Sequence, residues 1–266
     1  MSATRWGLIL ATGIGALAVI WFFWLSPRPA AVSATAVPPA AESVPEASAP
    51  LAPPDYPVPP PPPSAAALPD LDSSDDAFRG ALLAVPGAGP LEAMLIPDLL
   101  IRRIVVTIDN LPRERVALKL RPLNAAPGAF VVDAVDSSST ISPSNASRYR
   151  AALAVLQAID EQTLVALYFR WYPLFQKAYG ELGYPGASFN NRVVAVLDHL
   201  IGTPNVAEPI ALVKPKVYWE YADPALESAS SGRRLLWRIG ADNREALVAK
   251  LIAIRGRIVT GGVAAP

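Results

Sequence analysis

The chain has 266 residues, 52% of them hydrophobic, which is enough for one sizeable folded domain with further segments. Its 23 basic residues balance its 23 acidic ones, which argues against a general nucleic-acid-binding protein. The absence of cysteine and the presence of only one histidine exclude disulfides, thiolate chemistry and a histidine-rich metal site, but not an all-carboxylate site.

The first predicted element is a transmembrane helix over residues 6–25, after a short tail of residues 1–5. The segment carries no charged side chain, and a helix of about 20 residues spans the roughly 30 Å hydrocarbon core of a bilayer. Aromatic rings favour the headgroup region, and they stand at both ends of this segment: Trp6, Trp21, Phe22, Phe23 and Trp24. The alternative is a cleaved signal peptide, whose apolar core is usually shorter, about 7–15 residues.

The orientation of this anchor follows from a small charge bias. Arg5 and the α-amino group precede the apolar segment, whereas Arg28 is the one nearby basic residue after it, and acidic residues follow. The positive-inside rule then puts the N-terminus in the cytoplasm. We therefore expect a single-pass protein with its main domain outside the cytoplasm, which in a Gram-negative bacterium means an inner-membrane protein with a periplasmic domain.

A proline-rich linker is predicted over residues 26–74. This range is rich in Pro, Ala and Ser and includes the run Pro59–Pro63. Such sequence cannot bury a core and favours an extended, disordered chain. The simplest function is a spacer, and the alternative is a docking strip for a domain that binds proline-rich peptides.

Residues 75–258 are expected to form a helical domain, followed by a flexible tail over residues 259–266. Hydrophobic spacing and capping residues predict helices at about 75–85, 90–111 with a break at Pro97, 145–159, 160–182, 189–201, 224–239 and 242–258. Leu99 is expected on the apolar side of the second helix, and Asp75 is expected to cap the first. A small β-hairpin is predicted between Phe130 and Ile141. The fold class is thus mainly α, with an N-terminal transmembrane helix, a disordered linker and a compact domain of about seven helices.

Aromatic residues give a candidate binding groove. Tyr172 and Tyr179 belong to an aromatic stripe on one face of the helix over 160–182, and Tyr184 follows that helix. Together with Trp219 and Tyr221 they can line a groove for a sugar or peptide. An aromatic stripe is normally part of the core, because aromatic side chains bury large areas, and the groove is the functional alternative.

No complete catalytic motif is present in the sequence, and no cofactor is predicted. Asp198 and His199 are adjacent, and neighbouring helical residues point about 100° apart, so they cannot act as one dyad. A carboxylate-dependent hydrolase using Asp198 and Glu181 is one alternative function. A purely structural assembly module, marked by an exposed apolar patch, is another.

The C-terminal part of the domain is basic. The residues concerned are Arg233, Arg234, Arg238, Arg244, Lys250, Arg255 and Arg257. They are expected to form a solvated face, or alternatively a contact for an anionic partner such as lipid headgroups or an envelope polymer.

Several sequence blocks resemble one known family. They are Asp98-Leu-Leu-Ile-Arg-Arg, Thr107-Ile-Asp-Asn-Leu-Pro, Tyr172-Pro-Leu-Phe-Gln-Lys-Ala-Tyr-Gly-Glu-Leu-Gly-Tyr-Pro-Gly, Phe189-Asn-Asn-Arg, Asp198-His-Leu, Pro215-Lys-Val and Tyr221-Ala-Asp-Pro. Over residues 75–258 they are similar to the bacterial domain-of-unknown-function family numbered 3014. The resemblance implies a membrane-anchored bacterial protein and brings no activity, so no catalytic residue is assigned. We expect a binding or scaffold module whose partners are the bilayer and an envelope protein or polymer.

Overall fold

The computed structural model describes residues 54–63, 66–135 and 138–262. The predicted tail 1–5, the transmembrane helix 6–25 with its aromatic residues, and the linker up to residue 53 lie outside the described residues. The same holds for the end of the tail, residues 263–266. These expectations therefore stay predictions.

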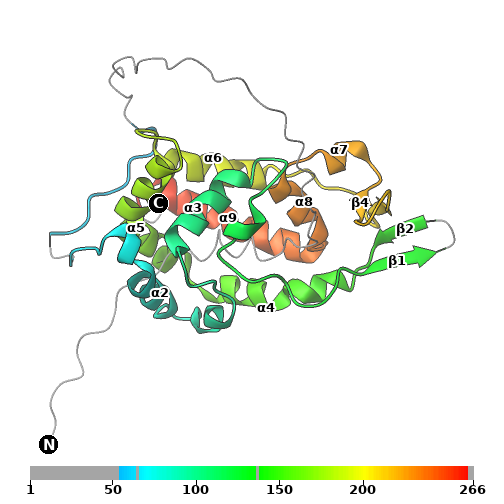
Figure 1. The fold of residues 1–266 in the computed structure, drawn as a ribbon, viewed down its shortest axis with the longest axis horizontal. Coiled ribbons are helices and arrows are strands. Elements are labelled where there is room, and N and C mark those ends of the chain that lie inside the picture. Colours follow the sequence, from blue (N-terminus) through cyan, green and yellow to red (C-terminus); the bar gives the residue numbers. More distant parts are fainter. Residues whose placement is uncertain (1–53, 64–65, 136–137, 263–266) are drawn as a thin grey trace, which may run out of the picture.

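The described residues form a mainly helical domain with one small sheet, as predicted (Figure 1). In chain order the elements are η1 (Leu71–Ser73), α2 (Asp75–Leu83), η2 (Gly89–Ala93), α3 (Leu100–Asn110), η3 (Leu118–Leu120), β1 (Val132–Val135), β2 (Ser138–Ile141), α4 (Asn145–Ala158), α5 (Glu161–Glu181), α6 (Phe189–Ile201), β3 (Ala211–Val213), β4 (Glu220–Tyr221), α7 (Pro224–Glu227), α8 (Ser231–Arg238) and α9 (Ala241–Val259). Within this part of the chain there are eight α-helices, not about seven, because the helix expected over 224–239 is two helices.

The core is formed where α9 packs against α4, α5 and α6 and where α3 packs against α5 and α6. Apolar side chains recur on α9 at helical spacing, and Leu247, Leu251, Ile254 and Ile258 are all buried. The long helix α5 begins where expected, because the Asp160 carboxylate accepts a hydrogen bond from the Thr163 N–H at 2.8 Å.

The membrane-spanning potential of the described helices is limited. None of them alone is long and apolar enough to cross a bilayer. Only α4 and α5 taken together have the length and apolar composition of a membrane span, and a bend of 82° lies between them.

The start of α3 differs from the expectation. The sequence pattern places Leu99 on the apolar side of the helix, but Leu99 is 46% exposed and has φ +54°. The chain turns sharply at Leu99, and α3 starts at Leu100. Asp75, expected to cap its own helix α2, instead accepts hydrogen bonds from the N–H groups of Leu99 and Leu100 at 2.7 and 2.8 Å. It thereby satisfies free donors at the start of α3. Pro90 opens only the short 3-10 helix η2.

The predicted hairpin is present as β1 and β2, which pair antiparallel from Val132–Ile141 to Val135–Ser138. The sequence did not predict the rest of the sheet. Strands β3 and β4 extend it in the order β1-β2-β3-β4, all antiparallel. Strands of two and three residues are too short to show an alternating pattern, which is why that region reads as irregular.

The expected helix 224–239 is interrupted because the start of α8 meets the end of α3. The N–H of Ser231 donates to the Arg113 carbonyl at 2.7 Å, and the N–H of Gly232 donates to the Leu111 carbonyl at 2.9 Å. The free donors of one helix thus satisfy acceptors at the end of the other. A Cβ at position 232 would lie 3.0 Å from the Leu111 oxygen and 2.5 Å from Cδ2 of Leu200, so this approach requires glycine.

Candidate functional site

The first turn of α6 carries the most elaborate group of polar contacts in the described part of the chain. Ser188 caps the helix, with its hydroxyl accepting the Asn191 N–H at 3.2 Å. Three consecutive polar residues follow Phe189: Asn190, Asn191 and Arg192. Successive helical residues point about 100° apart, so the three side chains reach different neighbours.

Asn190 and Asn191, which we call the amide clamp, hold the main chain of Tyr56. The Oδ1 of Asn191 accepts the Tyr56 N–H at 3.1 Å, and the Nδ2 of Asn190 donates to the Tyr56 carbonyl at 2.9 Å. The Nδ2 of Asn191 also donates to the Asp55 carboxylate at 3.0 Å. The clamp therefore binds both polar backbone groups of one residue in an extended, proline-rich segment.

The clamp is oriented from the side of α5. Asn190 is fully buried, and its Oδ1 accepts a hydrogen bond from the Tyr168 hydroxyl at 2.9 Å, which directs its NH₂ group towards Tyr56. Burial raises the pKa of Tyr168 well above its usual value, so this hydroxyl remains a donor. Gln176 adds a second support, since its Oε1 accepts from the Tyr172 hydroxyl at 2.7 Å and from the Phe189 N–H at 2.9 Å.

On another side of the same turn lies a group that we call the arginine–carboxylate cluster: Asp109, Arg113, Tyr184 and Arg192. The Asp109 carboxylate is buried and accepts from Arg113 Nη2 at 2.6 Å and from Arg192 Nε at 2.9 Å. Arg113 also donates to the Tyr184 hydroxyl at 2.7 Å. The charge of Asp109 raises the pKa of Arg113, so the cluster holds one carboxylate between two permanent cations.

The structure divides the predicted aromatic groove between two places. Tyr179 is buried and stacks on Tyr184 with ring centroids 4.6 Å apart, and Tyr172 and Tyr184 pack at the edge of the main core. Trp219 and Tyr221 belong to a second apolar cluster beside the sheet, with Ile210, Leu212 and Trp237. Burial raises the pKa of Tyr221 to about 12, and its hydroxyl donates to the Arg234 carbonyl. The five residues therefore do not form one groove.

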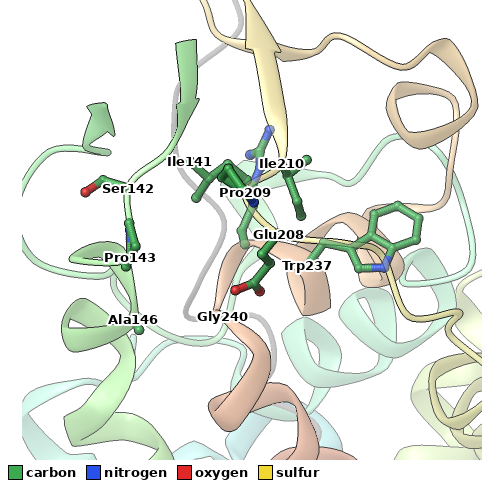
Figure 2. Close-up of a pocket in the computed structure, with 10 residues that line it drawn as sticks. Ile141, Ser142, Pro143, Ala146, Glu208, Pro209, Ile210, Trp237 and Gly240 are labelled. Atoms are coloured by element: carbon green, nitrogen blue, oxygen red, sulfur yellow. The ribbon is translucent and has the colours of Figure 1, made fainter. Parts of the chain in front are cut away.

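A cavity of about 270 Å³ lies next to the second apolar cluster (Figure 2). Figure 2 shows Ser142, Pro143 and Ala146 on one side and Glu208 and Trp237 on the other. The lining is largely apolar, and the Ser142 hydroxyl is already hydrogen-bonded to that of Ser144 at 3.0 Å. None of the five predicted groove residues lines it. It is smaller than most small-molecule sites, which measure about 300–1,000 Å³.

The two carboxylates of the hydrolase hypothesis are each paired with a different arginine. Glu181 binds Arg102 at 2.8 Å, and Asp198 binds Arg255 through two hydrogen bonds. Both carboxylates are on exposed residues. This arrangement places neither of them in the cleft between two facing carboxylates that a glycosidase-type hydrolase requires.

His199 does not act with Asp198, as the helical geometry predicts. Its Nε2 lies 2.7 Å from the hydroxyl of Ser230, which is the N-cap of α8 and accepts the Arg233 N–H. Burial, with the nearby charges of Arg233 and Arg192, lowers the pKa of His199. A serine that caps a helix and is 8% exposed is poorly placed as a nucleophile, so we assign this pair a structural role.

The basic C-terminal residues do not form one solvated face. Arg234 and Lys250 are buried and pair with Glu227 at 3.0 Å and with Glu161 at 2.7 Å, and Arg255 pairs with Asp198. Among the described residues there is no group of three or more acidic or histidine side chains arranged to hold a metal ion.

The sequence did not single out Asn190, Asn191, Asp109 or Arg192 as site residues. The sequence feature that could have indicated them is their place in two of the blocks that resemble the family, Thr107-Ile-Asp-Asn-Leu-Pro and Phe189-Asn-Asn-Arg. The fold brings these two blocks together with Tyr184. Polar residues directly after a helix cap are common, so nothing local marks Asn190 as buried or Asn191 as its partner in a clamp.

Comparison with known proteins supports the resemblance. No curated protein and no solved structure gives a significant match. Residues 100–255 match the family described as "Protein of unknown function (DUF3014)", and this range includes the amide clamp and the arginine–carboxylate cluster. The chain belongs to this family.

Proposed function

We propose that this protein is a non-enzymatic, single-pass membrane protein whose helical domain is a binding or scaffold module of the bacterial cell envelope. The uncharged, tryptophan-bordered segment 6–25 supports the anchor, and the proline-rich sequence after it supports a tether. The slight excess of positive charge before the segment supports a periplasmic domain.

The observation that carries the binding role is the amide clamp. Side-chain amides that hold both the N–H and the C=O of one residue recognise an extended main chain rather than a particular side chain. Extended and proline-rich segments are common ligands of binding modules, because little conformational entropy is lost when they dock. A preformed site of this kind is expected in a binding module.

In-cell photo-crosslinking tests the binding role. A photoreactive residue replaces Ala187, which is exposed and lies two residues before the start of α6. In a matched control it replaces Val217, which is 70% exposed and lies between β3 and β4. Figure 1 shows the sheet at one end of the long axis and α5 at the other, so the two positions sample different surfaces. Mass spectrometry should find envelope proteins attached at position 187 and not at position 217. Equal labelling at both positions, or none at 187 in repeated experiments, would refute the proposed role.

A reporter fusion tests the orientation separately. A reporter that is active only in the periplasm, fused after Pro266, is expected to be active in a well-expressed fusion. A silent reporter would overturn the periplasmic assignment and leave the peptide-binding geometry unaffected.

A further inference from the structure

The ligand already present in the amide clamp comes from the chain itself. Of residues 54–63, only Asp55, Tyr56 and Val58 have a backbone N–H, because all the others are prolines. The clamp binds one of these three donors and the carbonyl of the same residue. The Tyr56 side chain is partly buried and packs on the main core. The segment is thus held at its one Asp-Tyr pair.

The amide groups of the clamp require an occupant. The NH₂ group of the buried Asn190 donates to the Tyr56 carbonyl, and its oxygen is already used by Tyr168. If the segment left, a buried donor would lose its partner, which is unfavourable unless water or another peptide replaces it. The same argument defines the ligand: an extended peptide that supplies a carbonyl to Asn190, an N–H to Asn191 and a carboxylate to the Nδ2 of Asn191.

Beyond Tyr56 the segment makes fewer polar contacts. A Cβ at Gly261 would lie 3.4 Å from Cγ of Pro59, so the proline run passes the C-terminal end of α9. Arg170 of α5 donates to the Ala66 carbonyl, and the chain enters the core at the buried Leu71. Leu71 lies within the range first assigned to the linker. Between Tyr56 and Leu71 the proline run contributes no N–H groups, so the clamp dominates the polar recognition of the segment.

We propose that the start of α6 is a binding site for an extended, proline-flanked peptide with an Asp-Tyr pair, and that residues 54–63 of the same chain are its resident ligand, which can leave and rebind. The inference rests on the proposed binding role and adds the ligand class and its source. In the bound state the tether joins the domain at Asp55, and in the released state it joins at Ala66, whose carbonyl accepts a hydrogen bond from Arg170. An envelope partner with the same peptide chemistry would have to displace the chain's own segment.

A charge-swap series tests the recognition without depending on the overall fold. Asn191→Asp keeps an acceptor for the Tyr56 N–H but places two carboxylates against each other, so the segment should be released. Asp55→Asn combined with Asn191→Asp exchanges the same two side chains and should restore docking. The readout uses Pro59→Cys and Thr260→Cys, introduced into the cysteine-free full-length protein in detergent and joined by a short bismaleimide.

Cross-linking within one chain should be fast in the parent, at least about tenfold slower in Asn191→Asp, and restored in the double variant, because the rate follows the docked fraction. Equal rates in all three would refute the assigned contacts. Copies with two different tags distinguish the source of the segment, since cross-links between differently tagged chains would show that a second copy supplies it and would overturn the resident-ligand proposal.

A synthetic peptide of residues 52–63 tests displacement. Tyr56→Pro removes the N–H and the ring from the resident segment and should leave the clamp free in a folded protein. The labelled peptide should bind this variant at least about tenfold more tightly than it binds the parent, because a resident ligand lowers the competent fraction of the site. The same affinity for both proteins, or binding to neither, would overturn the inference even if photo-crosslinking at position 187 succeeds.

Discussion

The arginine–carboxylate cluster predicts a large loss of stability when a single charge is removed. Asp109→Asn keeps the shape of the side chain but leaves Arg113 and Arg192 without their shared anion. The new amide can still accept one hydrogen bond from Arg192 through its oxygen, while its NH₂ group would point at other donors, Arg113 or the Tyr184 hydroxyl. The cost should therefore come from both lost attraction and mismatched hydrogen bonds.

The magnitude follows from the exposure of the partners. Removing one member of a fully buried ion pair costs about 3–5 kcal/mol, whereas an exposed pair contributes about 0.2–1 kcal/mol. The Asp109 side chain is 5% exposed, but those of Arg192 and Arg113 are 27% and 50% exposed, so solvent compensates part of the loss. We expect the free energy of unfolding to fall by about 2–3 kcal/mol.

Urea unfolding of the full-length protein in detergent, followed by circular dichroism, measures this loss. The matched control is Asp198→Asn, whose partner is Arg255 and whose side chain is 47% exposed, and it should cost no more than about 1 kcal/mol. With a urea dependence of about 1–3 kcal/mol per molar, the Asp109 variant should unfold roughly 1 M earlier. Equal midpoints for the two variants would show that the cluster does not stabilise the domain.

Three further changes test other parts of the structure. His199 is the sole histidine, and its pKa is lowered in the folded protein, so the unfolded chain binds its proton more readily. The free energy of unfolding should therefore fall as the pH drops from about 7.5 through the usual histidine value near 6.5. The variant His199→Gln should remove most of this pH dependence between about pH 5.5 and 7.5 in thermal melts. Gly232→Ala should destabilise the domain by about 1–3 kcal/mol, because the new Cβ meets Leu111 and Leu200. The control Gly180→Ala has open space around it and should be neutral or stabilising by up to about 1 kcal/mol. A similar loss of stability in both variants would contradict the close approach of α8 to α3. Asp160→Ala should cost about 1 kcal/mol in urea unfolding by removing the N-cap of α5, and Asp242→Ala, which is not the cap of its helix α9, should cost less.

Most helices could be predicted because their signals are local. Asp160 caps α5 and Phe189 begins α6 as expected, since a capping side chain and a 3.6-residue apolar pattern lie within a few residues of each other. The aromatic stripe of α5 is core, as its composition predicts, with Tyr168, Phe175 and Tyr179 buried.

The features that escaped prediction depend on contacts between distant residues. The break between α7 and α8 is determined by the end of α3, more than 100 residues earlier in the chain. Likewise, Asn190 and Asn191 act as a clamp only because Tyr56, separated from them by 134 and 135 positions, lies against them. No local pattern in either segment encodes its partner, and a proline-rich composition alone indicates an extended chain without indicating where it docks.

The geometry of α6 explains how the resident segment can leave without unfolding the domain. Asn190 and Arg192 are two residues apart and therefore point about 200° around the helix axis, to nearly opposite sides. Arg192 fixes the turn to α3 through the side chain and the carbonyl of Asp109, and Ser188 caps it, while Asn190 binds the segment. The contacts that hold the helix in place are thus separate from those that hold the ligand. Loss of the segment should therefore free the clamp while its orientation, set by Tyr168, persists.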